Sequence, residues 1–210
     1  MEDKNQKLPS TRIQWYPGHM AKTKKQIIED LKLVDIVIEV LDARLPKASE
    51  NPDLKELLKN KPKIVVLNKS DLSEEKINKE WVEYYKKQDI PAILVNSNSG
   101  EGINNVISQI KKISQKQNET LIEKGRIGKK ARVMVVGIPN VGKSSFINRI
   151  AKKNSAIVGN KPGVTRQKQW VRVNENIELL DTPGVLWPKF ENEEVALNLA
   201  FTGTIKDEIL

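Results

Sequence analysis

One short segment in the second half of the chain has the residue types and spacing of a loop that binds phosphate groups. Gly137-Ile-Pro-Asn-Val-Gly-Lys143-Ser144 fits the pattern Gly-x-x-x-x-Gly-Lys-Ser/Thr, between an apolar run and an amphipathic stretch. Glycines let the backbone N–H groups fold around phosphates, the lysine reaches the β- and γ-phosphates, and the hydroxyl ligates Mg²⁺. We therefore predict phosphate binding by Asn140, Val141, Gly142, Lys143, Ser144 and Ser145, with Ser144 also a metal ligand.

Two segments farther along the chain have residues suited to the γ-phosphate and to a magnesium ion. Asp181-Thr-Pro-Gly184 follows an apolar run, so its carboxylate would stand at the end of a strand. There Asp181 would hold Mg²⁺ through a water molecule, and the Gly184 N–H would be donated to the γ-phosphate. Between the two motifs, the loop 161–165 ends in Thr165, whose hydroxyl we expect to complete the metal shell when the γ-phosphate is present.

A third set of polar residues, earlier in the chain, has the chemistry to recognise a guanine base. Asp71 ends the segment 68–71, which follows an apolar run, and an ionised carboxylate there can only accept hydrogen bonds. Guanine offers an N–H and an amino group side by side, whereas adenine offers an acceptor, so Asp71 argues against a kinase or an ATPase. The next strand is followed by residues whose N–H groups can face the guanine carbonyl. The predicted guanine-binding residues are Asn68, Lys69, Ser70, Asp71, Ser97 and Asn98.

The elements that must position these residues alternate along the chain. Short β-branched runs predict strands, and longer stretches with helical spacing of apolar residues predict helices. Because the apolar runs are nearly continuous, we expect strands covered on both faces, in an α/β fold with a doubly wound, mostly parallel sheet. The predicted strands are 35–41, 63–67, 92–95, 132–136, 169–173 and 177–180, and the predicted helices are 20–33, 53–59, 74–88, 103–117 and 144–152.

The order of the motifs is rotated relative to familiar P-loop GTPases, in which the phosphate loop comes first. Here the guanine motifs precede the phosphate motifs, so we predict a circularly permuted GTPase fold. With Gln14-Trp-Tyr-Pro-Gly-His-Met20 near the start and residues 181–188 near the end, the chain resembles the ribosome biogenesis GTPase A family, also called RbgA or YlqF. This resemblance covers nearly all of residues 13–210. It implies a role in late assembly of the large ribosomal subunit, with GTP hydrolysis timing release.

Three regions are expected along the chain. Residues 1–33 would form an N-terminal extension and a basic helix, and residues 34–185 would form the permuted GTPase domain, with a linker at about 115–130. Residues 186–210 would begin a C-terminal helical segment, truncated relative to the family that the chain resembles. Members of that family continue into a helical domain that touches ribosomal RNA.

The net charge of +9 is unevenly distributed. Residues 108–132 hold eight Lys or Arg against two Glu, and residues 149–172 hold seven Lys or Arg and no acidic residue. Such stretches attract phosphate backbones, so the expected partners are GTP or GDP and the large ribosomal subunit with its RNA, although a solvated linker and a positive pocket rim are the alternative. There is no cysteine and no apolar run long enough to span a bilayer, which favours a cytoplasmic protein without a membrane partner. The oligomeric state is left open.

The sequence lacks the glutamine that orients the attacking water in many GTPases. Many GTPases orient the attacking water with a glutamine just after Asp-x-x-Gly, and that position is Val185 here, so we expect slow intrinsic hydrolysis that the ribosomal subunit stimulates. The resemblance marks His19, the single histidine, as a candidate catalytic residue that orients the water. Asn140 resembles an asparagine that binds K⁺ in similar loops, so K⁺ is a second candidate cofactor beside Mg²⁺. The predicted function is a GTP-hydrolysing assembly factor, and the alternative is a GTP-sensing RNA- or ribosome-binding module with incidental hydrolysis.

Overall fold

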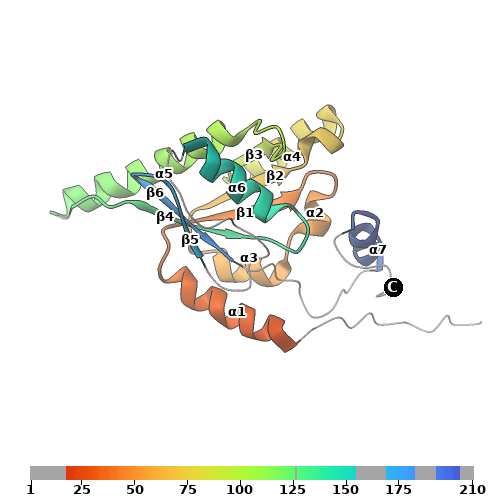
Figure 1. Cartoon of the computed structure of the whole chain (residues 1–210), viewed down its shortest axis with the longest axis horizontal. Helices are drawn as coiled ribbons and strands as arrows, with labels where there is room; N and C mark the ends of the chain where they lie inside the picture. Colours follow the sequence, from red (N-terminus) through yellow and green to blue (C-terminus); the bar gives the residue numbers. More distant parts are fainter. Residues whose placement is uncertain (1–17, 126, 155–168, 183–192, 204–210) are drawn as a thin grey trace, which may run out of the picture.

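Six strands form one sheet in the order β3-β2-β1-β4-β6-β5 (Figure 1). The computed structural model describes residues 18–125, 127–154, 169–182 and 193–203. Neighbouring strands are parallel except β5, which runs antiparallel to β6. The strands are β1 (Ile36–Asp42), β2 (Lys63–Asn68), β3 (Ala92–Val95), β4 (Ala131–Val136), β5 (Gln169–Asn174) and β6 (Ile177–Asp181).

Helices cover both faces of this sheet, as the apolar strand sequences require. Helices α1 and α3 pack on one face through Ile27, Leu31, Leu54 and Leu58, and α5 and α6 pack on the other (Figure 1). Tyr85 of α4 packs against β2 in a third cluster. The helices are α1 (Gly18–Leu31), α2 (Pro46–Ser49), α3 (Pro52–Leu58), α4 (Glu75–Lys86), α5 (Ile103–Glu123), α6 (Lys143–Asn154) and α7 (Glu193–Phe201), with a 3₁₀-helix, η1 (Ser70–Leu72).

The central strand β1 is buried along its whole length. Every residue of β1 is buried, including Glu39, whose carboxylate pairs with the Lys63 ammonium at 2.9 Å. Burial raises the pKa of Glu39 more than the attraction of Lys63 lowers it. A strand with both faces covered needs a nearly continuous apolar sequence. This explains why apolar and polar residues do not alternate along β1 and β4.

The predicted strands agree with the observed ones to within one residue at each end. The largest difference among the predicted helices is at α5, which continues past the predicted end at Gln117 to Glu123, so regular helix replaces the first part of the expected linker. The Asn118 side chain bonds the N–H and the carbonyl of Lys129, which fixes the returning chain beside the helix. The short elements α2 and η1 were not predicted, because they span fewer residues than a periodic pattern needs.

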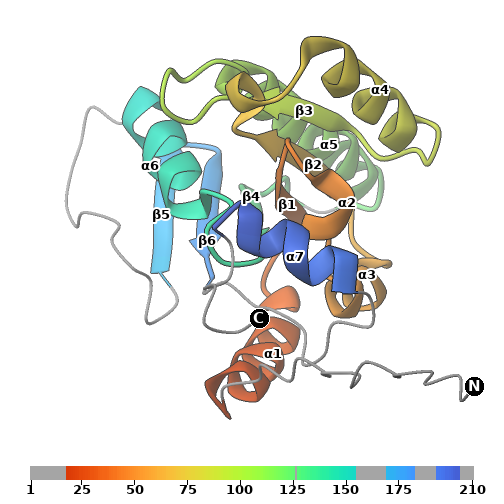
Figure 2. The same ribbon diagram turned by 90° about the vertical axis from the view of Figure 1, so that its right-hand side faces the viewer.

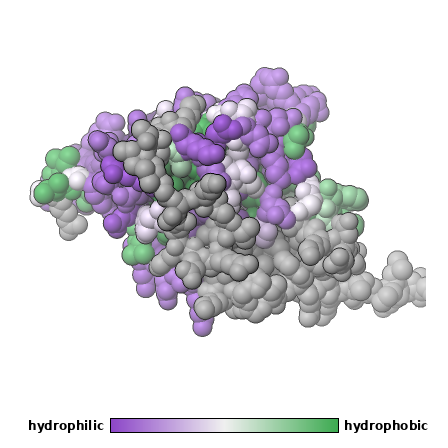
Figure 3. Space-filling view, viewed as in Figure 1, coloured by the Kyte–Doolittle hydropathy of each residue, from purple (hydrophilic) through white to green (hydrophobic). Residues whose placement is uncertain are grey.

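Helix α7 lies beside α2, at the side of the molecule that faces the viewer in Figure 2. It falls within the predicted C-terminal helical segment. Among the described residues, no helix is both long and apolar enough to cross a bilayer. The described surface in Figure 3 is largely hydrophilic, and hydrophobic residues gather at the tip where α5 ends.

Candidate nucleotide site

The loops at the carboxyl ends of the parallel strands surround a cavity of about 650 Å³. Such an edge is where ligands bind in open α/β sheets, and the volume is typical of a ligand pocket. Four further lining residues were not predicted, namely Arg44, Leu72, Asn96 and Thr202. The predicted site residues that line the cavity are Asn68, Lys69, Asp71, Ser97, Asn98, Asn140, Gly142, Lys143, Ser144 and Ser145.

The other predicted site residues lie around or beyond this cavity. Val141 and Asp181 are buried beside it, and the Ser70 carbonyl accepts a hydrogen bond from the Asn78 side chain. Thr165 and Gly184 lie outside the described residues. His19 lies in the first turn of α1, and its side chain is outside the described part of the chain.

Asn68, at the end of β2, joins the two halves of the site. Its amide donates to the Val141 carbonyl in the phosphate loop at 2.8 Å. Its side-chain oxygen accepts from the Ser97 hydroxyl at 2.7 Å and from the Ser97 N–H at 3.2 Å. All of these groups are buried, so one side chain fixes the spacing between the phosphate loop and the loop after β3.

The backbone of the phosphate loop leaves no room for a side chain at two of its glycines. Gly142 has φ +91°, and a Cβ there would lie 2.3 Å from the Asn68 amide nitrogen. Gly137 has φ +152°, and its Cβ would lie 2.5 Å from the Val40 carbonyl oxygen. Asn140 also adopts a left-handed conformation, at φ +61°. Glycine is required where the backbone approaches another group this closely, and helix α6 starts directly after the loop.

Lys143, the first residue of α6, holds its ammonium inside the loop. Its Nζ donates to the Ile138 carbonyl at 2.8 Å, and its side chain is buried. Burial lowers the pKa of Lys143 to about 8, although the nearby carboxylate of Asp181 opposes this shift. A buried cation beside N–H groups at a helix N-terminus favours the binding of an anion such as a phosphate chain.

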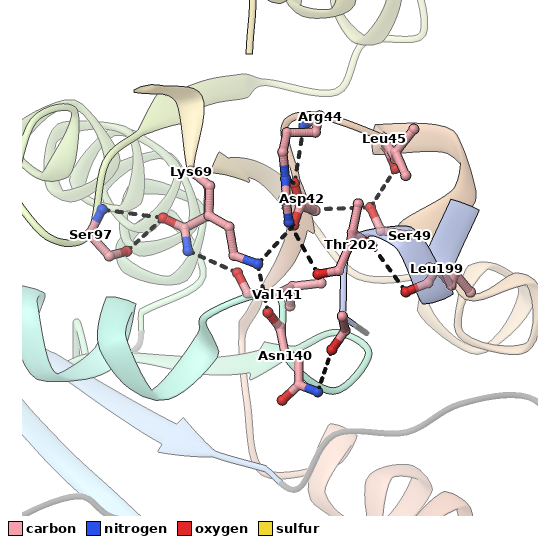
Figure 4. Close-up of polar contacts among 12 residues, drawn as sticks. Asp42, Arg44, Leu45, Ser49, Lys69, Ser97, Asn140, Val141, Leu199 and Thr202 are labelled. Atoms are coloured by element: carbon pink, nitrogen blue, oxygen red, sulfur yellow. Dashed lines mark hydrogen bonds and ion pairs between the residues drawn. The ribbon is translucent and has the colours of Figure 1, made fainter. Parts of the chain in front are cut away.

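Asp42, Arg44 and Lys69 form a charged network at the cavity wall, seen in Figure 4. Asp42, at the end of β1, accepts from the Arg44 guanidinium at 2.9 and 2.7 Å and from the Lys69 ammonium at 2.8 Å. Burial alone would raise the pKa of Asp42, but these hydrogen bonds outweigh it and hold the pKa below its usual value. Lys69 also donates to the Asn140 carbonyl at 2.8 Å. The signal for Asp42 was in the sequence, since it is a carboxylate that ends an apolar strand.

The end of α7 contacts both this network and the phosphate loop. The Asn140 amide donates to the Gly203 carbonyl at 2.9 Å, and the Arg44 guanidinium donates to the Thr202 carbonyl at 3.4 Å. Thr202 itself lines the cavity. The C-terminal helix therefore ends at the mouth of the candidate site.

The side of the cavity predicted to bind the base is lined by Asp71. Asp71 lies on η1, which begins directly after Lys69. Lys69 has a left-handed backbone (φ +61°), which turns the chain away from β2. The side chain of Asp71 is exposed at the cavity and can receive two donors. Arg149 of α6 donates to the carbonyls of Ser97 and Asn98, which holds the loop after β3 against the phosphate half.

The available donors fit a magnesium ion. Mg²⁺ prefers hard oxygen ligands, and the site offers the Ser144 hydroxyl at the start of α6 and the Asp181 carboxylate at the end of β6. The Asp181 carboxylate is also close enough to Lys143 to influence its charge. Ser144 and Asp181 are therefore the candidate magnesium ligands among the described residues.

Comparison with known proteins identifies the family of the chain. Residues 132–210 match the family described as 50S ribosome-binding GTPase. The chain is 50% identical over 198 residues to Ribosome biogenesis GTPase A of Bacillus pumilus, which covers 94% of this chain and 70% of that protein. The corresponding protein of Thermotoga maritima is 36% identical over 196 residues, covering 93% and 68%.

A solved structure has a similar fold. GNP-bound YlqF from T. maritima superposes with a TM-score of 0.67 at 31% identity, covering 90% of this chain and 69% of that one. The predicted α/β fold and the predicted GTPase activity are therefore confirmed. The chain belongs to the ribosome biogenesis GTPase A family.

Proposed function

We propose that this GTPase acts in assembly of the large ribosomal subunit, binding the maturing particle with GTP and leaving after hydrolysis. The observation that carries the proposal is the cavity in which the loop of Asp71 and the loop of Lys143 meet. The description of the matching family, a 50S ribosome-binding GTPase, supports the large subunit as the partner. The basic stretches 108–132 and 149–172 supply charge that suits ribosomal RNA.

In this proposal, Asp71 selects the base. Its exposed carboxylate accepts from the guanine N–H and amino group, while the Lys69 stem lies along the base. The ammonium of Lys69 is already held by Asp42 and Asn140, so the stem needs little further ordering. Ser97 and Asn98 complete the base pocket from the loop after β3.

The phosphates bind at the start of α6. Lys143 contacts the β- and γ-phosphates, and the N–H groups from Asn140 to Ser145 surround them. Ser144 and Asp181 would hold Mg²⁺, which neutralises phosphate charge when it is bound. Thr165 and Gly184 are proposed to respond to the γ-phosphate from the segments on either side of β5 and β6.

Hydrolysis needs an oriented water and positive charge near the γ-phosphate. His19 is the proposed water-orienting residue, because Val185 has no polar group. Asn140 is the proposed K⁺ ligand through its side-chain oxygen, while its amide nitrogen holds Gly203. Turnover should be faster in KCl than in NaCl, and Asn140→Ala should remove this difference, whereas Asn118→Ala, an asparagine on α5, should keep it. Equal rates in the two salts with the unaltered chain would exclude the K⁺ site.

The main test measures GTP turnover alone, with large subunits and with small subunits, using Lys143→Ala as the blank. Marked stimulation by large subunits alone is expected, together with cosedimentation with large-subunit particles in a nonhydrolysable GTP analogue at low salt. His19→Ala should lose the stimulation but keep GDP binding. No cosedimentation and no stimulation, despite tight GDP binding, would overturn the proposed partner.

A further inference from the structure

The edge strand β5 and the start of β4 form a basic, aromatic surface that does not line the nucleotide cavity. Residues alternate along a strand, so Trp170 and Arg172 of β5 lie on the same face of the sheet. In the strand register, Arg172 is opposite Glu178 of β6, and Glu178 is in turn opposite Arg132 of β4. We call Lys130, Arg132, Trp170 and Arg172 the Arg–Trp surface.

The side chains of this surface contact one another across β6. The Arg132 guanidinium lies 5.5 Å from the centre of the Trp170 ring, at cation–π distance. Glu178 pairs with the Lys130 ammonium at 3.4 Å and approaches the Arg132 guanidinium at 3.9 Å. Lys130 and Arg132 thus share the charge of Glu178. Together with Arg172, the surface carries three cations against this one carboxylate, which leaves it positive.

Trp170 is unusually accessible for its type. It is 39% exposed, although tryptophan is normally among the more buried residues. The side chains of Arg132 and Lys130 are about half exposed, at 53% and 50%. The surface can therefore contact a ligand in two ways. The Trp170 ring can stack on a flat group, and the surrounding cations can bind negative charge.

We propose that the Arg–Trp surface binds single-stranded RNA, with one unpaired base stacked on Trp170 and the neighbouring phosphates on Arg132, Arg172 and Lys130. Stacking on an aromatic ring needs an unstacked base, which favours single strands or loops over duplex RNA. The excess of cations favours RNA over an apolar protein surface. This inference rests on the proposed ribosomal function and gives the particle's RNA a point of contact.

The surface extends to the nucleotide edge of the sheet. Gln169 is opposite Asp181 in the register, so Trp170 is one residue from the end of the sheet where Asp181, the proposed magnesium ligand, lies. None of the four residues lines the nucleotide cavity. Variants of this surface should therefore keep basal GTP turnover, which gives a control for correct folding.

The experiment measures binding of a fluorescein-labelled, unstructured 12-nucleotide RNA by anisotropy, with the full chain and GDP. Trp170→Ala should weaken binding about tenfold, and Trp170→Phe should retain most of the affinity. Arg172→Gln should reduce the slope of log affinity against log salt by about 0.7. Tyr84→Ala is the matched control, since Tyr84 on α4 is also 39% exposed, and it should bind as the unaltered chain does.

The same variants are then tested for cosedimentation with large-subunit particles. If the unaltered chain and Trp170→Ala bind the 12-mer equally, the inference is overturned, whether or not particles are bound. Tighter binding of a duplex of equal length, or of polyglutamate in place of RNA, would also overturn it. If the unaltered chain fails to cosediment while RNA binding still depends on Trp170, the proposed function fails and the RNA surface stands.

Discussion

Replacement of Asn68 by alanine should separate the two loops of the nucleotide site. The side chain is 2% exposed and makes three hydrogen bonds, of 2.8, 2.7 and 3.2 Å, to Val141 and Ser97. Alanine removes all three and leaves the Val141 carbonyl and the Ser97 N–H in a buried region with fewer partners. The protein should lose stability and also the fixed spacing between its phosphate and base loops.

The size of the effect follows from the number and burial of these bonds. A buried hydrogen bond contributes about 1 kcal/mol net, and a buried group left unsatisfied costs about 1–3 kcal/mol. Asn68→Ala should therefore lower the free energy of unfolding by about 3 kcal/mol, or roughly 10 °C in Tm for a chain of this size. Ser97→Ala removes only the hydroxyl bond and should lower it by about 1 kcal/mol.

The assay is urea unfolding of the nucleotide-free protein, followed by calorimetric titration with GDP. Asn78→Ala is a matched control, because Asn78 is 4% exposed and bonds Ser70 and Ser73 without contacting the phosphate loop. It should destabilise the fold by about 2 kcal/mol. GDP affinity should fall about tenfold more in Asn68→Ala than in Ser97→Ala. An unfolding free energy within about 0.5 kcal/mol of the unaltered chain would refute the bridging role of Asn68.

Three other predictions concern single residues of the site. Phosphates bind the protonated lysine, and burial lowers the pKa of Lys143 to about 8. GDP affinity should therefore fall as the pH rises through 8. The GDP affinity of Lys143→Arg should stay constant from about pH 7 to 9, because arginine remains protonated there. A pH-independent affinity for the unaltered chain would contradict this reasoning. Asp71→Asn should weaken GDP binding by about 100-fold and improve binding of xanthosine diphosphate, measured by competition, because an amide can donate to the xanthine carbonyl. Gly142→Ala should destabilise the fold by about 3 kcal/mol in urea unfolding, while Gly125→Ala, with φ +69° and open space around it, should lose only about 1 kcal/mol.

The sequence predicted the sheet and most of the cavity because both depend on local patterns. Strands buried on both faces have continuous apolar runs, and ligand loops follow directly after them, as Asn68 follows Leu67. The phosphate loop was recognisable because glycine is needed where Gly142 approaches Asn68. These features can be seen within about ten residues of sequence.

The contacts that were not predicted join segments that are distant in the sequence. Arg44 and Thr202 are 158 positions apart, and their contact requires α7 to return to the end of β1. Arg149 reaches Ser97 across 52 positions for a similar reason. The true length of α5 was missed because polar residues such as Asn118 weaken the apolar spacing, although their side chains secure the following turn.

The order of strands gives the sheet a seam. Residues 36–95 build β1, β2 and β3, residues 131–181 build β4, β5 and β6, and the two groups are paired only where β1 meets β4 among the described strands (Figure 1). Across the seam, Asn68 reaches Val141 and Arg149 reaches Ser97, while α1 packs on Val37 from one side and Met134 from the other. A chain cut between α5 and β4 would give two complementary fragments. If Asp71 binds the base and Lys143 the phosphates, as proposed, a guanine nucleotide would bind both fragments and hold them together as a non-covalent cross-link.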